Sequence, residues 1–156
     1  MVARTPARVL LVDEDPRSSE EISISLMGNG IHVHWAPNAS TALRLLDEFH
    51  FDVALVEVQL PECSGIDLIR QLARRAPSIL PILLATRPCV ESAVAAVRVG
   101  AFDYLVKPID DVRLAQVVSE AVRARHVLDA HAAFESRRAA SARTEDPRSV
   151  GAVATS

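Results

Sequence analysis

The sequence predicts an α/β fold, a doubly wound five-stranded parallel sheet with strand order 2-1-3-4-5 and helices on both faces. Short apolar runs alternate five times with segments of helical periodicity, a pattern typical of parallel sheets. The run 53–56 is apolar throughout, as expected of a central strand that is buried on both faces. The run 31–35 alternates between apolar and polar residues, which indicates an edge strand with one wetter face.

The first strand is expected at 9–12, and a helix start follows it. Asp15 is a favoured N-cap residue, and Pro16 suits the first helical position because no amide donor is needed there. The segment 28–30, which contains two glycines, is expected to end this helix. Residues 22–26 also alternate as a strand would, so the helix is inferred from its start signal and from its place in the order of elements.

The later elements follow from capping and breaking residues. Asn38 can cap the second helix, and Gly100 can end the fourth. Pro81 opens the fourth strand, where a missing amide donor is tolerated. The other predicted elements are helices at 64–75 and 90–99 and strands at 81–85 and 102–106.

Length and charge limit the functions that the chain can have. At 156 residues it fits one ordinary domain with an appendage, and a second catalytic domain does not fit. The net charge of -3 gives no overall field that favours nucleic acid or an acidic membrane, so direct nucleic-acid binding is not expected. The first apolar run, of about four residues, is too short for a secretory signal or a membrane span. We therefore expect a cytoplasmic protein without a membrane segment.

Charged residues follow three of the predicted strands directly. Asp13 and Glu14 follow the first strand, Glu57 ends the central one, and Lys107 follows the last. Because the carboxyl ends of parallel strands meet at one edge of the sheet, these side chains are expected to lie in a single crevice.

Spaced motifs along the chain resemble those of the receiver domains of bacterial response regulators. The resemblance covers roughly residues 7–124 and implies a receiver-like, flavodoxin-like fold. It rests on the segment 11–16 (Leu-Val-Asp-Glu-Asp-Pro), on Glu57 followed by Pro61 and Gly65, on Thr86, and on the segment 100–108 (Gly-Ala-Phe-Asp-Tyr-Leu-Val-Lys-Pro).

The resemblance implies that such a domain moves a phosphoryl group from a donor histidine onto its own aspartate, with Mg²⁺ as cofactor. A carboxylate is an adequate nucleophile when cations neutralise the incoming phosphate. The implied metal ligands are Asp13, Glu14, Glu57 and the backbone carbonyl of Gln59. The resemblance also implies roles for four further residues. Thr86 would donate a hydrogen bond to a phosphoryl oxygen, and Lys107 would pair with the phosphoryl group or the carboxylate. Pro108 would set a tight turn, cis or trans, and Tyr104 matches an aromatic residue whose rotamer reports activation.

Two of these roles have alternatives. Counting forward from Pro81 selects Thr86 as the switch hydroxyl, whereas counting back from Gly100 selects Ala85. A one-residue deletion in the loop 87–89 reconciles the two counts, and Thr86 is preferred. Tyr104 could also be an edge-strand tyrosine without a switching role.

Glu57 stands where the family has the aspartate that receives the phosphoryl group. Its extra methylene moves the carboxylate roughly 1.5 Å outward, an offset that can cost about 10²-fold in rate. Ordinary phosphotransfer should therefore be weak or absent, and so should Mg²⁺ binding. Glu57 could hold the domain in an active-like conformation. Alternatively, the pocket could be retired, meaning that it no longer takes part in signalling while the fold serves as an interaction module.

These considerations predict a pseudo-receiver, a non-enzymatic module of a phosphorelay that regulates a partner by conformation-dependent binding. The expected partners are a sensor histidine kinase, a downstream effector, or a second copy bound through the last strand-helix face or the C-terminal helix. The alternative is a magnesium-dependent phosphotransferase or phosphatase that uses the same carboxylates, although no histidine is available as a general base in the pocket loops. A nucleotide-binding role is disfavoured because no glycine-rich phosphate loop follows the first strand.

Beyond the receiver-like domain, 125–138 is expected to form a helical extension and 139–156 a disordered tail. Arg125 interrupts the apolar stripe of the extension, so a fraying helix is the simpler interpretation. The alternative is a partner helix that packs on Val127, Leu128 and Phe134. The sequence leaves open whether the chain is free-standing or the front of a longer regulator.

Two residue pairs carry weaker signals. Cys63 and Cys89 both fall in loops at strand carboxyl ends, where they could form a redox pair or stay as free thiols. His32 and His34 share one face of the edge strand, as metal ligands could, but no third ligand lies near them in the sequence.

Overall fold

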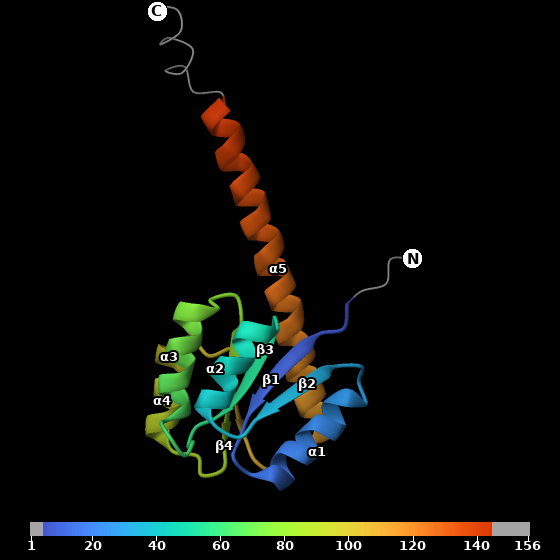
Figure 1. The fold of residues 1–156 in the computed structure, drawn as a ribbon, viewed down its shortest axis with the longest axis vertical. Coiled ribbons are helices and arrows are strands. Elements are labelled where there is room, and N and C mark those ends of the chain that lie inside the picture. Colours follow the sequence, from blue (N-terminus) through green and yellow to red (C-terminus); the bar gives the residue numbers. More distant parts are fainter. Residues whose placement is uncertain (1–4, 145–156) are drawn as a thin grey trace, which may run out of the picture. The chain divides into compact units, whose positions relative to one another are not determined.

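The computed structural model describes residues 5–144 and contains one five-stranded parallel sheet with strand order β2-β1-β3-β4-β5 (Figure 1). The predicted fold class and strand order are therefore confirmed. The elements in chain order are β1 (Arg8–Val12), α1 (Pro16–Met27), β2 (His32–Ala36), α2 (Ala39–Glu48), β3 (Val53–Glu57), α3 (Gly65–Arg75), β4 (Leu80–Ala85), α4 (Val90–Arg98), β5 (Asp103–Val106) and α5 (Asp111–Thr144).

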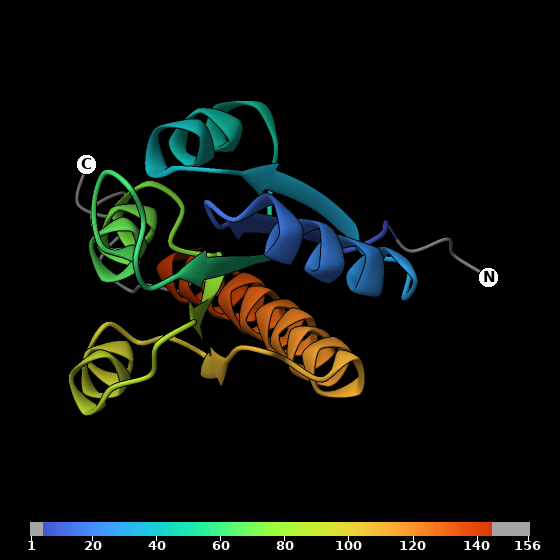
Figure 2. The same ribbon diagram turned by 90° about the horizontal axis from the view of Figure 1, so that it is seen from below.

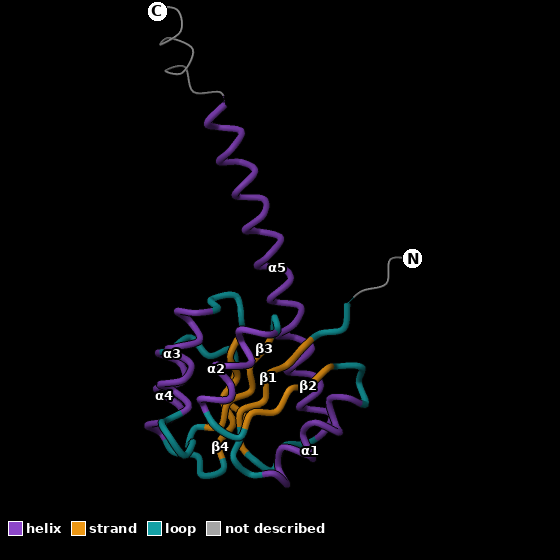
Figure 3. Tube along the Cα trace, in the orientation of Figure 1, coloured by secondary structure: helices purple, strands orange, loops and turns teal. Residues whose placement is uncertain are grey.

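Helices cover both faces of the sheet, with the strands between them (Figures 2 and 3). Alternate residues of the strands point to opposite faces and build two separate cores. The core on one face joins Leu10, Ala54 and Leu83 to α2, α3 and α4. The core on the other face joins Leu11, Leu55 and residues of α1 and α5. β3 is buried along its whole length, as predicted for the central strand.

The segment with strand-like alternation is helical, because its capping signals and its packing agree. The side chain of Asp15 accepts a hydrogen bond from the backbone N–H of Arg17 at 3.0 Å, and Pro16 is the first helical residue. Ile22 and Leu26 are buried against the sheet, four residues apart, whereas Ile24 between them is 64% exposed. One of the alternating apolar residues is thus left on the surface.

The C-terminal helix is longer than predicted. α5 continues through residues 139–144, so the prediction that disorder begins at 139 is wrong for those residues. Ala139, Ala140 and Ala142 are strong helix formers, which explains the continuation. The remainder of the predicted tail, 145–156, lies outside the described residues. Internal contacts divide the chain into the units Met1–Arg125 and His126–Ser156. In the part of α5 from 126 to 143, every described side chain is exposed.

Arg125, the last residue of the first unit, binds the amino-terminal end of the sheet. Its guanidinium donates to the carbonyl and, at 3.1 Å, to the hydroxyl oxygen of Ser78, and lies 3.6 Å from Asp52 Oδ1. The other carboxylate oxygen of Asp52 accepts the backbone N–H of Arg8 at 3.0 Å. The residue that interrupts the apolar stripe is therefore an anchor for α5.

We expect Arg125→Met to lower the free energy of unfolding by about 1 to 3 kcal/mol, because the partners on Ser78 and Asp52 lose a charged donor. Urea denaturation would measure the change. Arg123→Met, at an exposed position of the same helix, is the matched control and should stay within about 0.5 kcal/mol of wild type. Equal effects of the two substitutions would contradict the anchoring role.

None of the helices in residues 5–144 is both long enough and apolar enough to cross a membrane.

Candidate functional site

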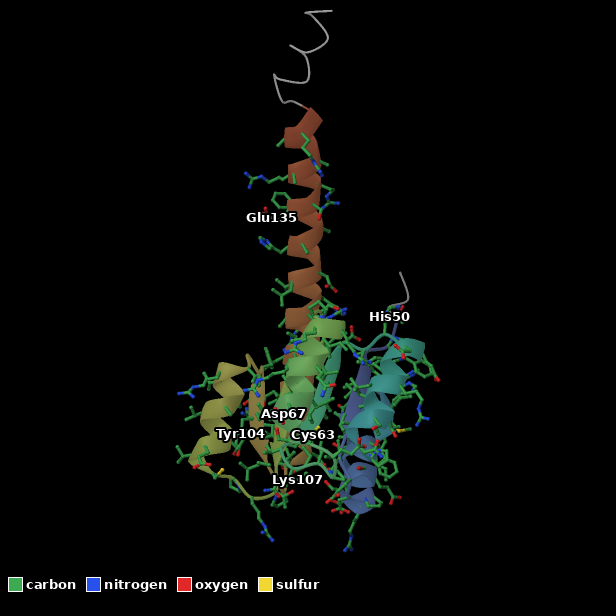
Figure 4. All side chains as sticks on the ribbon, turned by 60° about the vertical axis from the view of Figure 1, so that its left-hand side comes forward. His50, Cys63, Asp67, Tyr104, Lys107 and Glu135 are labelled. Carbon is green, nitrogen blue, oxygen red and sulfur yellow. The ribbon has the colours of Figure 1, made fainter. Side chains whose placement is uncertain are left out.

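The carboxyl ends of β1 and β3 bring two carboxyl groups close to the single lysine of the chain. Asp13 is only 2% exposed and Glu57 only 5%. Lys107, just after β5, places its Nζ 2.5 Å from Asp13 Oδ2 and 2.8 Å from Glu57 Oε2 (Figure 4 labels Lys107). The Lys107–Pro108 peptide bond is cis. Two carboxyl groups thus share one ammonium in a largely buried network.

Thr86 completes this network from the end of β4. Its backbone N–H and its hydroxyl both donate to Glu57 Oε1 at 3.2 Å. Ala85 is buried within β4 and pairs with Val106, so of the two candidate switch positions it is Thr86 that lies against Glu57. The two oxygens of Glu57 therefore reach two different elements, Thr86 through Oε1 and Lys107 through Oε2.

The remaining residues of the predicted site line an open cavity beside the network. Glu14 is exposed, and Gln59 lies on the loop after β3. The cavity is bounded by Asp13, Glu14, Asp15, Glu57, Gln59, Thr86 and Arg87. Four of these seven residues are acidic, so the cavity favours cations over anions.

Most of the carboxyl oxygens at this edge of the sheet already contact donors of the protein itself. Oxygen ligands such as those of Asp13, Glu14 and Glu57 have the right chemistry for Mg²⁺. However, Asp13 Oδ1 accepts the N–H of Asp15 at 3.0 Å, and its Oδ2 accepts Lys107. Both oxygens of Glu57 are likewise engaged, although the contact of Oε2 with Lys107 is an ion pair without hydrogen-bond geometry. Within residues 5–144 no group of three His, Cys, Asp or Glu side chains is placed to hold a metal ion.

Gly65, at the start of α3, allows the loop after β3 to fold back onto Glu57. A Cβ atom on this residue would lie 2.1 Å from the carbonyl oxygen of Glu57, a distance that real atoms do not adopt. The N–H of Gly65 donates to the carbonyl of Val58 at 2.7 Å. The glycine is therefore required by this close approach of α3 to the end of β3.

Trp35 is a residue of the site that the sequence did not reveal. Its indole Nε1 donates to the backbone carbonyl of Asp13 at 2.7 Å, while the N–H of Asp13 donates to the carbonyl of Ala36 at 3.1 Å. The edge strand β2 thus makes hydrogen bonds with both the carbonyl and the N–H of Asp13. The acceptor is a backbone carbonyl, so no pattern of side chains in the sequence indicates this contact.

Tyr104 lies outside the carboxylate network. Its side chain (labelled in Figure 4) is half-buried in the core beneath α4. Its hydroxyl lies 2.6 Å from Ser92 Oγ. Ser92 belongs to α4, so Tyr104 connects β5 to that helix.

The two cysteines are not joined to each other, and His34 packs against an aromatic ring. Cys63 and Cys89 are free thiols. The contact with the Ser92 side chain and a hydrogen bond from the Ser92 backbone N–H lower the pKa of Cys89, whereas burial and nearby acidic groups raise the pKa of Cys63. The ring of His34 packs 4.3 Å from that of Phe49, and burial, Arg8 and His32 together lower the pKa of His34.

Lys107 remains charged at neutral pH. Burial alone would lower the pKa of its ammonium, but the hydrogen bond to Asp13, the close contact with Glu57 and the charges of both carboxylates raise this pKa above its ordinary value of 10.5. A raised lysine pKa contributes stability that is fully present below the pKa of the unfolded chain and is lost as the pH rises through the pKa of the folded state.

We therefore expect the free energy of unfolding to lose the Lys107 contribution only above pH 10.5. Because Lys107 is the only lysine in the sequence, reductive methylation with ¹³C followed by NMR reports its titration separately from that of the terminal amine. A titration midpoint below 10.5 would contradict the ion pairs described above.

Comparison with known proteins agrees with this geometry. The model of the "Response regulator receiver domain" family matches residues 9–119. The regulatory protein AtoC of Escherichia coli (strain K12) is 34% identical over 116 residues, which cover 74% of this chain and 25% of AtoC. The response regulator protein PilR of Pseudomonas aeruginosa is 33% identical over 119 residues, which cover 76% of this chain and 27% of PilR. The chain thus spans about a quarter of the length of these relatives.

Solved structures lead to the same result. A receiver domain from Clostridium thermocellum superimposes with a TM-score of 0.73 at 27% identity, covering 78% of this chain and 98% of that domain. A CheY-like receiver domain from Methanospirillum hungatei JF-1 gives a TM-score of 0.74 at 24% identity, over 78% and 98% of the two chains, and shows the fold alone. From its family match, its sheet order and the grouping of Asp13, Glu57, Thr86 and Lys107, this chain belongs to the response regulator receiver domains of two-component systems.

Proposed function

We propose that this receiver domain regulates its partner without an aspartyl phosphate, because Glu57 occupies the phospho-acceptor position and holds the domain in an active-like conformation. The observation that carries the proposal is that the two oxygens of the Glu57 carboxylate contact different residues. One oxygen accepts hydrogen bonds from Thr86, and the other lies against the ammonium of Lys107. An aspartate has one methylene less and would sit farther from both groups. A carboxylate has about one charge against nearly two for a phosphoryl group, so the mimicry is partial.

The proposed output surface is formed by α4 and β5. Val90, Val94 and Val97 lie at positions i, i+4 and i+7 of α4 and are 78%, 42% and 78% exposed. Val106, at the end of the edge strand β5, is 43% exposed. Apolar residues at this spacing suit the side of another helix. The partner is a downstream effector or a second copy of the chain, and a sensor histidine kinase upstream would transfer its phosphoryl group poorly.

The same proposal makes the domain non-enzymatic and only weakly responsive to Mg²⁺. The Lys107 ammonium already lies between the carboxyl groups that a metal would need, and no histidine is among the residues that line the cavity. A magnesium-dependent phosphatase or phosphotransferase, the other candidate, would turn over generic phosphoesters. We expect no turnover above background.

Glu57→Gln tests the active-like conformation. The amide keeps the shape of the side chain but loses the ion pair with Lys107, so we expect self-association of the chain to weaken by about tenfold. Analytical ultracentrifugation measures the association, and the fluorescence of Trp35, the single tryptophan, reports on the Asp13 end of the pocket.

Val97→Asp serves as the positive control, because it should abolish association through the surface itself. Identical association of wild type and Glu57→Gln, with Val97→Asp impaired, would instead support a retired pocket on an interaction module.

A further inference from the structure

α4 is anchored to the rest of the domain by very small side chains. Of its nine residues only Ser92 and Ala96 are buried, while the three valines described above face outward. A buried methyl and a buried hydroxymethyl group contribute little hydrophobic stabilisation, since this scales with the apolar area removed from water. The position of α4 must therefore depend on more specific contacts than those of a helix with a leucine-rich face.

Ser92 makes such a contact. It is 8% exposed, and its hydroxyl oxygen lies 2.6 Å from the hydroxyl of Tyr104, 3.1 Å from the carbonyl of Cys89 and 3.3 Å from Cys89 Sγ. A serine hydroxyl has one hydrogen to donate and two lone pairs to accept with. The carbonyl of Cys89 can only accept, so it takes the Ser92 hydrogen. Tyr104 is then the donor in the contact between the two hydroxyls.

The bond joins two elements at the edge of the sheet. Within residues 5–144, β5 is an edge strand that pairs with β4 alone, and Tyr104 stands opposite Leu83 in that pairing. Tyr104 is therefore held by the sheet, while Ser92 lies in the first turns of α4, whose N-cap is Cys89.

We infer that Ser92 is a positioning residue, which latches α4 to Tyr104 and so fixes the valine surface relative to β5. The inference rests on the proposed function for one point, that the valine surface binds a partner. The hydrogen bond between Ser92 and Tyr104 is a property of the isolated domain. This bond gives the Tyr104 hydroxyl a partner on α4, and it gives the buried serine a role beyond capping its own helix.

A double-mutant cycle on the full chain tests the latch, with amide hydrogen exchange of residues 94–98 as the readout. Ser92→Ala and Tyr104→Phe each remove the same hydrogen bond, from opposite sides. Each should raise the exchange rates of α4 by about fivefold to tenfold, and the double variant should exchange no faster than Ser92→Ala, which also loses the bond to the Cys89 carbonyl. Ser92→Thr, which keeps the hydroxyl, should restore slow exchange. Ser40→Ala, which removes an exposed hydroxyl bound to Glu62 at 2.6 Å, should leave α4 unchanged.

The opposite result is equally clear. If Ser92 acts only as a local cap, Ser92→Ala speeds exchange while Tyr104→Phe does not, and the latch is refuted. Additive effects of the two substitutions would refute it as well. Failure of the proposed function looks different, because Val97→Asp would then leave self-association unchanged while the cycle still shows coupling between Ser92 and Tyr104.

Discussion

Glu57→Asp is expected to accept a phosphoryl group from acetyl phosphate in the presence of Mg²⁺ about 10²-fold faster than wild type. The shorter side chain withdraws its carboxylate from Thr86 and Lys107, which frees both groups to hold the oxygens of an incoming phosphate. Wild type should remain almost unlabelled, since its carboxylate already occupies that space. Intact-mass spectrometry over a time course measures the rate, and peptide mapping locates the modified residue.

Glu57→Gln is the control for this experiment, because an amide cannot serve as the nucleophile. Labelling of Glu57→Gln would show that another residue reacts. Rapid, stoichiometric labelling of wild type at Glu57 itself, stable to acid but not to base, would overturn both the active-like and the retired interpretation of the site.

Lys107→Met is expected to reduce the free energy of unfolding at neutral pH by about 3 to 5 kcal/mol, the usual cost of breaking a buried ion pair on one side. Lys107 is largely buried, with 14% of its side chain exposed, and it is the cation that Asp13 and Glu57 share. Without it, two carboxyl groups face each other with no positive charge between them. Urea denaturation at neutral pH gives the loss directly.

Arg113→Met is the matched control, because the Arg113–Asp103 pair is 3.5 Å long and its side chains are 54% and 32% exposed. Its loss should cost at most about 1 kcal/mol. A similar cost for both variants would contradict the role of Lys107.

The fold could be predicted because burial leaves a direct pattern in the sequence. The unbroken apolar run of β3 and the alternation in β2 identify a central and an edge strand, and the structure has them in those places. The end of α5 could not be predicted in the same way. Residues 139–144 have no apolar stripe, and their helix depends on the intrinsic preference of alanine rather than on packing.

The site could be predicted as far as its parts lie at strand ends. Asp13, Glu57 and Lys107 meet because parallel strands share a carboxyl edge. The choice between Thr86 and Ala85 depended on a loop of altered length, which residue counting alone does not resolve. Trp35 escaped prediction because its bond to Asp13 spans two strands and involves a backbone carbonyl, which leaves no trace in side-chain patterns.

The closed network of Glu57, Thr86 and Lys107 also has a consequence for timing. The acyl phosphate bond of a phosphorylated aspartate hydrolyses, and its lifetime limits the duration of the signal, whereas a glutamate side chain is permanent. A domain that signals through such a side chain does not switch itself off by hydrolysis. The strength and duration of its output then follow the number of copies in the cell and the rates at which these are made, bound and degraded.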